Sequence, residues 1–160
     1  MNLLLCGVNH KTAPVALREK LACLIPEVGH AYVHLKTWPE VSESLVYTTC
    51  NRVEVLCVSE APDAAAARVR EFFGRHPEIA PGDLEESFYL RRDREAVQHL
   101  FRVAASLDSM VVGEPQILGQ VKRAYREATE HRATGPILKQ SISSALPKVI
   151  PLLLAPCPLR

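Results

Sequence analysis

Cys50 is the residue of this sequence best placed to act as a nucleophile. It follows a run of β-forming residues, in the string TTCNR, where a predicted strand meets a turn and its side chains become exposed. Arg52 lies two residues further on, where its charge would favour the thiolate, the reactive form of a cysteine. The alternative is a small buried side chain without a chemical role. For an arbitrary cysteine the second interpretation is the more common one, and it is the polar neighbours Thr, Asn and Arg that make the first worth considering.

His99 is the second candidate, because an imidazole can give or take a proton near neutral pH. On a predicted helix that begins near Asp93, it lies about 150° away from the apolar stripe at ~100° per residue. We therefore expect it to face solvent or a cleft, either as a proton carrier or as a surface histidine without a role. The stripe expected to face the core consists of Val97, Leu100, Phe101 and Ala104.

Several polar residues around the next predicted helix, from Pro115 to about His131, could bind a ligand. Gln116 and Gln120 are spaced i, i+4 on its polar side, where they could bracket a polar group or form a solvated surface. Glu114 could stabilise the helix start through the dipole or bind a cationic amine. Ser109 could be a turn residue or a donor to a carboxylate.

The cysteine count and the charge exclude several classes of site. The five cysteines, at positions 6, 23, 50, 57 and 157, show no CxxC or Cys/His metal spacing, so we expect neither a disulfide framework nor a metal site. We interpret Cys6 and Cys57 as buried small side chains of strands. A formal charge of +1 provides no strong field for a polyanion. No signal peptide, membrane span or membrane partner is expected, and a reducing cytoplasm fits best.

The segments that must position these residues alternate as strand, helix, strand, strand, helix, strand. The expected strands are 3–8, 44–49, 53–58 and 87–90, with one helix after Pro14 and another capped by Asp63 and ended by Gly74. This order predicts an α+β fold of the ferredoxin-like split-βαβ type, an antiparallel sheet with both helices on one face. The helices near Asp93 and Pro115 are two C-terminal additions, and one domain spans 1–135.

Residues 136–160 differ in composition from the rest of the chain. No Asp or Glu occurs after Glu130, and five prolines interrupt short apolar runs. Such spacing disfavours helices and strands, so we predict a disordered Pro-rich tail. Its composition is that of translation in a shifted frame or of a truncated gene model.

Three segments together resemble the glutamyl-tRNA reductases: GVNHKTAP (7–14), TTCNRVE (48–54) and HLFRVAASLDSMVVGEPQILGQVKRAY (99–125). The resemblance covers about residues 3 to 135 in the same order and spacing, and it ends after Leu138. The long ungapped string is far more specific than a short glycine motif.

The resemblance implies an oxidoreductase that reduces glutamyl-tRNA(Glu) to glutamate-1-semialdehyde with NADPH, in tetrapyrrole (porphyrin and heme) biosynthesis. It implies that Cys50 attacks the aminoacyl ester to form a thioester and that His99 assists. Arg52 would then pair with a substrate carboxylate and Glu114 with the α-ammonium. The substrate pocket implied in this way consists of Thr49, Asn51, Arg52, Ser109, Glu114, Pro115, Gln116 and Gln120.

The family's cofactor is NADPH, but no GxGxxG follows a strand here, so we expect its binding domain to be missing from this chain. The family also implies a homodimer and a downstream glutamate-1-semialdehyde aminomutase as partner. We therefore expect this chain to be limited to substrate binding and to formation and hydrolysis of the thioester. The alternatives are a non-catalytic module that binds tRNA or a partner, and an inactive truncated gene product.

Overall fold

The protein is built on one antiparallel sheet of four strands in the order β2-β3-β1-β4. The computed structural model describes residues 1–24, 28–109 and 116–144. This strand order is that of the split-βαβ arrangement, so the predicted fold class is confirmed. The strands are β1 (Asn2–Asn9), β2 (Glu43–Thr49), β3 (Arg52–Ser59) and β4 (Tyr89–Arg92).

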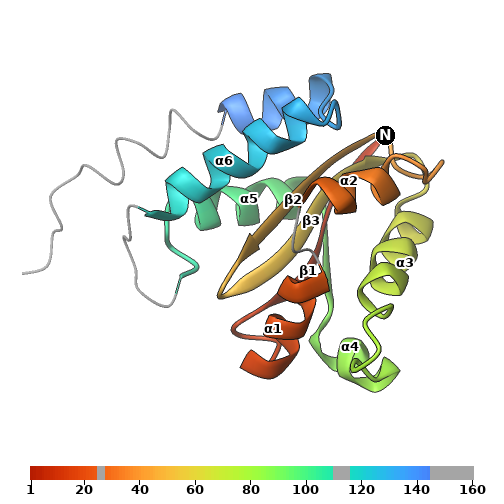
Figure 1. The fold of residues 1–160 in the computed structure, drawn as a ribbon. Helices are drawn as coiled ribbons and strands as arrows, with labels where there is room; N and C mark the ends of the chain where they lie inside the picture. The colour runs from red at the N-terminus through yellow and green to blue at the C-terminus, as the bar shows by residue number, and fades with distance from the viewer. Residues whose placement is uncertain (25–27, 110–115, 145–160) are drawn as a thin grey trace, which may run out of the picture.

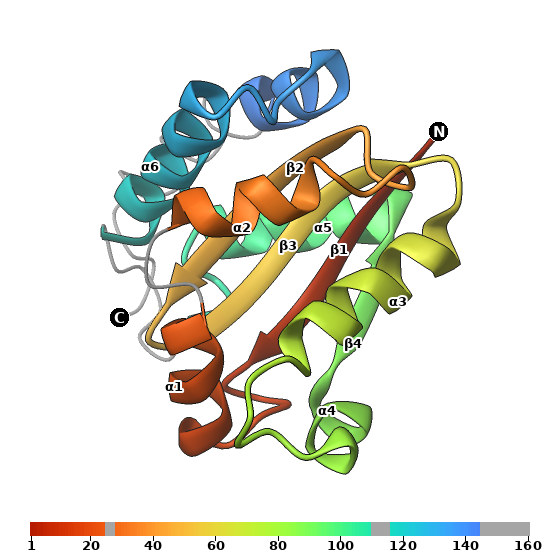
Figure 2. The ribbon, with the colours of Figure 1, turned by 45° about the vertical axis from the view of Figure 1, so that its right-hand side comes forward.

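Helices cover both faces of the sheet (Figure 1). On one face lie α2 (Val28–Leu35) and α3 (Pro62–Phe73), and on the opposite face lie α5 (Asp93–Ala104) and α6 (Gln116–Glu130). Two further helices, α1 (Val15–Leu24) and α4 (Pro81–Ser87), lie near the end of the sheet where β1 finishes (Figure 2). Among the described residues, no helix is both long and apolar enough to cross a membrane.

Because both faces are covered, β3 is buried along its whole length, including its charged residues. Alternation along the paired strands places Gly7, Arg52 and Glu54 on the face that α5 covers. Gly7 has φ +156°, and a Cβ there would lie 2.2 Å from the carbonyl oxygen of Val53. Only glycine fits this position, so β1 and β3 meet closely beside the buried charges.

Several element boundaries differ from those predicted. Neither Asp63 nor Asp93 caps a helix: α3 begins with Pro62, and the Asp93 carboxylate accepts a hydrogen bond from Leu3 N at 3.0 Å instead. Because the Asp93 carboxylate binds a backbone N–H at the start of β1, it is not free to cap its own helix. β4 begins two residues later than predicted, and α2 and α4 were not predicted because each is too short for a clear periodic pattern.

The prediction of a disordered tail is wrong for its first part, because residues 136–144 form a helix. Pro136 lies in the first turn, where proline is tolerated, and the next proline comes only at 147. Leu138 and Ile142 are fully buried. The Glu43 carboxylate, at the start of β2, accepts hydrogen bonds from Ile137 N at 3.1 Å and from Leu138 N at 2.7 Å. Residues 145–160 lie outside the described residues.

This helix also explains Gly135. A Cβ at that position would lie 2.5 Å from Glu43 Oε1, so the carboxylate reaches the helix start only because residue 135 has no side chain. A carboxylate against free N–H groups at a helix start is favoured by charge and by hydrogen bonding.

We predict that Leu138→Ala lowers the free energy of unfolding by about 2–4 kcal/mol, since it empties a fully buried site. Thermal unfolding should show a loss of several degrees in the midpoint. Lys139→Ala, an exposed position on the same helix, is the matched control and should leave the midpoint nearly unchanged. Equal midpoints for both variants would show that this helix does not contribute to the core.

Candidate active site

Cys50 lies in a two-residue turn between β2 and β3, closed by the pairing of Thr49 with Arg52. Its side chain is exposed, while the backbone of the turn is held by three hydrogen bonds. His10 N donates to Asn51 O at 2.8 Å, Asn51 N donates to Thr49 Oγ1 at 3.1 Å, and an arginine binds Cys50 O. The turn therefore presents a solvent-accessible thiol on a fixed backbone.

The arginine is Arg18 of α1, which is 7% exposed. Its Nη1 donates to Cys50 O at 2.5 Å and to Asn51 Oδ1 at 3.3 Å, and its Nε donates to Ala13 O at 3.3 Å. A buried guanidinium with several acceptors forms charge-assisted hydrogen bonds, which are stronger than neutral ones. Arg18 thus ties the turn that carries Cys50 to α1.

Beneath the turn, a buried network joins β3 to α5. Glu54 Oε1 accepts from Arg52 Nη1 at 2.9 Å, from His99 Nε2 at 2.8 Å and from the Tyr89 hydroxyl. His99 Nε2 also lies 3.3 Å from Arg52 Nη1. Arg52 and Glu54 are each 3% exposed and His99 is 4% exposed. With Nε2 directed at Glu54, Nδ1 is the ring nitrogen of His99 left to exchange a proton with another group.

Asp108 completes the pairing of Arg52. Arg52 Nη2 donates to the backbone oxygen of Asp108 and to its Oδ2 at 3.3 Å, and Lys11 Nζ binds Oδ1. The chain reaches this position because Ser106 adopts a left-handed conformation, φ 55°, just after α5. Arg52 therefore links Glu54 of β3 to the loop that follows α5.

The electrostatics of this network favour the ionised carboxylates. Burial acts to raise the pKa of Glu54, but the hydrogen bond from His99 and the charge of Arg52 outweigh it, so the pKa lies below its ordinary value. For Asp108, burial likewise acts to raise the pKa, and Lys11 and Arg52 bring it below the ordinary value. Burial and the Glu54 carboxylate raise the pKa of Tyr89, so it remains a neutral donor.

His99 departs from its predicted orientation. The face of α5 that packs on the sheet is rotated by about one residue from the predicted stripe, so Val97 and Phe101 are only half-buried. The sequence pattern excluded a histidine from the core because it could not reveal Glu54 as a buried partner. His99 nevertheless lines a solvent-open pocket of about 380 Å³, which agrees with the expectation that it would face a cleft. Its lining is Lys11, Arg91, Glu95, Gln98, His99, Arg102 and Asp108.

The other predicted site residues differ in how far they are exposed. Thr49, Asn51 and Ser109 are half-buried, and Gln116 is exposed at the start of α6. Gln120 is half-buried, and its Oε1 is buried without a hydrogen-bond partner among the described residues. The turn after β2, the end of α5 and the start of α6 lie at the same end of the sheet (Figures 1 and 2). Glu114 and Pro115 lie outside the described residues.

Two of the three other described cysteines, Cys6 and Cys57, are buried and therefore poor candidates for a nucleophile. Burial raises the pKa of Cys57 to about 12 and the pKa of Cys6 well above its ordinary value, so neither supplies a thiolate at neutral pH. Their interpretation as buried strand residues is confirmed. Cys23 is exposed on α1, away from the buried network in sequence and in element.

Arg18, Glu54, Tyr89 and Asp108 were not identified from the sequence. Arg52 and Glu54 gave one usable signal, because opposite charges at i and i+2 of a strand share a face and can pair. No comparable pattern marks Arg18, whose acceptors in the turn, Cys50 and Asn51, lie more than thirty positions away in the chain.

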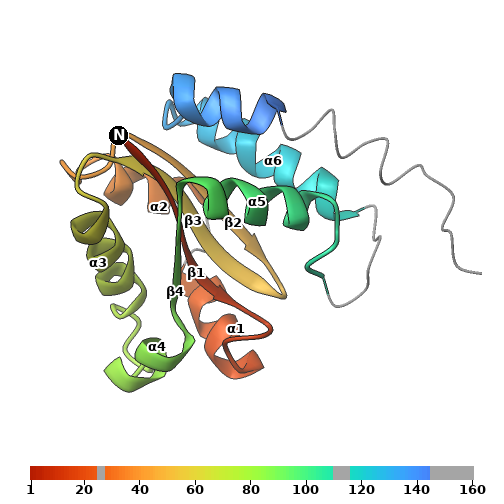
Figure 3. The ribbon, with the colours of Figure 1, turned by 180° about the vertical axis from the view of Figure 1, so that it is seen from behind.

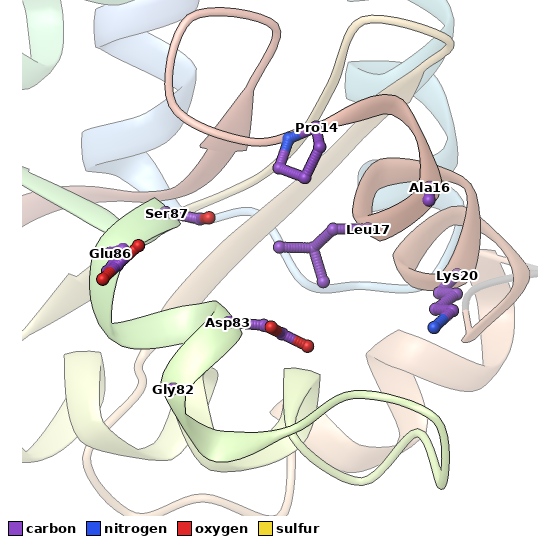
Figure 4. A pocket seen from close by; sticks show the side chains of 8 residues that line it. All are labelled: Pro14, Ala16, Leu17, Lys20, Gly82, Asp83, Glu86 and Ser87. Atoms are coloured by element: carbon purple, nitrogen blue, oxygen red, sulfur yellow. The ribbon is translucent and has the colours of Figure 1, made fainter.

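A second hollow, of about 440 Å³, lies between α1 and α4 and contains none of the predicted site residues (Figure 4). The side chains of Pro14 and Leu17 line one side, with Asp83 and Glu86 of α4 opposite. Its Lys20 is held by the backbone oxygen of Glu78 at 2.9 Å.

The described residues offer no fit for a metal or for a dinucleotide. No group of three or more His, Cys, Asp or Glu among them could hold a metal ion. All strand pairings in the described sheet are antiparallel, whereas the nucleotide-binding glycine turn requires a parallel βαβ unit.

Comparison with known proteins places the chain in context. The family model described as "Glutamyl-tRNAGlu reductase, N-terminal domain" matches residues 6–148. The glutamyl-tRNA reductase of Desulfatibacillum aliphaticivorans is 44% identical over 140 residues, covering 88% of this chain and 32% of that protein. That of Synechococcus elongatus is 38% identical over 146 residues, covering 91% and 33%. This chain thus spans about a third of the length of these relatives.

A solved structure supports the same comparison. The glutamyl-tRNA reductase from Methanopyrus kandleri superposes with a TM-score of 0.69 at 31% identity, covering 94% of this chain and 34% of that one. The family match continues to residue 148, so the resemblance extends ten residues beyond its expected end at Leu138.

We predict that Arg18→Lys loosens the turn that carries Cys50, because an ammonium cannot reproduce the fork of a guanidinium. Hydrogen exchange at Asn51 should accelerate, and the midpoint of thermal unfolding should fall by a few degrees, as expected for hydrogen bonds worth roughly 1.5–3 kcal/mol. Arg68→Lys, on the exposed side of α3, is the control. Unchanged exchange at Asn51 would contradict the anchoring role.

Glu54→Gln should lower stability at neutral pH by about 3 kcal/mol, because it leaves Arg52 and His99 with an uncharged partner. The pKa of Glu54 is lowered in the fold, so its stabilisation is present above the unfolded pKa near 4.5 and is lost as the pH falls below that value. The variant should therefore lose less stability than the wild type between pH 5 and pH 3. Denaturant titrations across that range, with exposed Glu85→Gln as control, measure the difference. Parallel pH profiles for the wild type and Glu54→Gln would contradict the assignment.

Proposed function

We infer that this chain, which belongs to the family of the glutamyl-tRNA reductase N-terminal domain, binds the glutamyl end of glutamyl-tRNA(Glu) and transfers the glutamyl group to Cys50. The observation that carries this proposal is the exposed thiol of Cys50 on a backbone anchored by Arg18, two residues before Arg52, whose side chain binds Glu54 of the buried Glu54–His99 pair. The relatives named above are glutamyl-tRNA reductases, and their name gives the substrate that we propose.

The proposed step is acyl transfer. The Cys50 thiolate attacks the ester carbonyl carbon, the C–S bond forms, and the C–O bond to the terminal ribose breaks. The thiol proton ends on the departing ribose oxygen, so no oxidant or reductant is consumed. His99 is the proposed proton carrier, with its ring fixed by Glu54 so that Nδ1 can accept and return the proton. Water then hydrolyses the thioester slowly, which restores Cys50.

Recognition of the glutamyl group is proposed for the residues around the turn. Gln120 supports this role, because a buried amide oxygen without a partner is costly unless a ligand or water satisfies it. Arg52 is proposed to meet the substrate carboxylate, although its Nη1 and Nη2 already bind Glu54 and Asp108. It must therefore use its remaining N–H groups, and much of its effect is to hold His99. Thr49, Asn51, Ser109, Glu114, Pro115 and Gln116 complete the proposed pocket.

Reduction to glutamate-1-semialdehyde requires a hydride donor, which in this proposal is NADPH bound outside these residues. Since the chain spans about a third of its relatives, the complete reductase activity, its place in tetrapyrrole biosynthesis, a homodimer, a partnership with the aminomutase and a cytoplasmic location are proposals for a longer protein. For this chain we propose thioester formation and hydrolysis without reduction.

We predict that the chain releases free tRNA from glutamyl-tRNA, and that no semialdehyde forms when NADPH is added. Cys50→Ser should reduce the release by at least about a hundredfold, because a hydroxyl is a far weaker nucleophile at neutral pH. Cys23→Ser, which changes another exposed cysteine, is the matched control and should release tRNA like the wild type. Labelled glutamyl-tRNA and acid quenching give the rates.

Two results would count against the proposal. Equal release by wild type and Cys50→Ser would remove Cys50 from the reaction, and binding of glutamyl-tRNA without any release would favour the non-catalytic module. Semialdehyde formation by this chain would overturn the claim that it cannot reduce its product.

A further inference from the structure

The outward side of α5 presents arginines along a single line. Arg94, Gln98 and Arg102 are exposed and follow each other at intervals of four residues, so they share one side of the helix. Phe101 and Val97 lie beside this line and are half-buried. Figure 3 views the molecule from the side on which α5 lies. We refer to this surface, together with Arg91 of β4, as the α5 outer face.

Two adjoining hollows make the α5 outer face a groove. One, of about 650 Å³, is lined by Arg94, Val97, Gln98, Phe101 and Arg102. The other is the pocket of about 380 Å³ that His99 borders, and it shares Gln98 and Arg102 with the first. A chain lying along α5 would thus pass from the arginines directly to His99.

The arginines of this groove have no carboxylate partner among the described residues. Arg91, Arg94 and Arg102 form no ion pair with any described residue, whereas Arg92 pairs with Asp63 and Lys11 with Asp108. Arg91 Nε is buried and has no hydrogen-bond partner within the described part of the chain. The acids that line the groove are Glu95 and Asp108, and Asp108 is already held by Lys11 and Arg52.

This concentration of charge is local, because the whole chain carries a formal charge of only +1. Unpaired guanidinium groups in a groove are suited to phosphate, which they bind through several N–H donors. A half-exposed aromatic ring between them adds a surface on which an unpaired base can stack. Arg94 and Arg102 are about 12 Å apart along the helix, a span of roughly three to four nucleotides.

We propose that the α5 outer face binds the single-stranded acceptor end of the tRNA, with Arg91, Arg94 and Arg102 on its phosphates and Phe101 against one base. This rests on the proposed function, in which the terminal ribose must reach His99 and Cys50. The single strand is favoured over a duplex, because a base can stack on Phe101 only when it is unpaired. The occupant is RNA rather than an acidic protein segment, since a ring between arginines serves a base and a carboxylate chain would leave it unused.

The test measures binding of this chain to tRNA with and without its 3′-terminal CCA, by fluorescence anisotropy over a range of salt concentrations. For the wild type we expect removal of CCA to weaken binding about tenfold. For Arg94→Ala/Arg102→Ala we expect intact tRNA to bind about tenfold more weakly, with the salt slope reduced by roughly 1 to 2, and removal of CCA to have little further effect. Both side chains are exposed, so the fold should be retained, and thermal unfolding verifies this.

The matched control is Arg68→Ala/Arg75→Ala, which removes the same charge from α3 and its end, on the opposite face of the sheet. It should leave both the affinity and the effect of CCA unchanged. If both double variants bound tRNA equally weakly, affinity would depend on net charge and not on the position of the arginines, which would overturn the proposal. So would retention of the full CCA effect in Arg94→Ala/Arg102→Ala.

Failure of the proposed function would look different. If the wild type forms no glutamyl thioester, the acyl transfer is wrong whatever the tRNA affinities are. If the thioester forms and the α5 variants bind tRNA like the wild type, the proposed function stands and only the docking surface is wrong.

Discussion

Two residues of opposite charge, Arg52 and Glu54, lie two positions apart on the same face of β3 and are buried between the sheet and α5. A charge removed from water costs several kcal/mol unless partners compensate it, so every group around this pair is constrained. Glu54 must receive donors, which fixes His99 and Tyr89. Arg52 must find acceptors, which brings Asp108 back to the sheet after α5. The position of His99 therefore follows from the need to neutralise a buried ion pair.

The fold could be predicted from the sequence because its strands and longer helices have clear periods, and the strand order follows from a common arrangement. Much of the candidate site could not. His99 was expected outside the core, since periodicity registers an apolar stripe and not a buried polar partner. Arg18 left no signal, because its acceptors at Cys50 and Asn51 become neighbours only in the folded chain. The exposed position of Cys50 at the end of a strand could be predicted from its polar neighbours.

The same principle accounts for the error in the tail. Counting prolines treats each as an interruption, yet Pro136 begins a helix and leaves room for a buried Leu138 and Ile142. The start of that helix is satisfied by Glu43, a residue of β2 about ninety positions earlier. Both at Glu43 and at Glu54, a buried carboxylate on the sheet organises an element that is distant in sequence. Local patterns locate elements, and long-range polar pairing places them.

The central claim is that Cys50 receives the glutamyl group from glutamyl-tRNA. The direct measurement is mass spectrometry of the chain after brief incubation with glutamyl-tRNA, quenching in acid and protease digestion, with each cysteine-containing peptide examined. We predict one added glutamyl group on the peptide that contains Cys50, released by hydroxylamine as expected for a thioester. A glutamyl group found only on the Cys23 peptide, or no adduct while tRNA is still deacylated, would contradict this account.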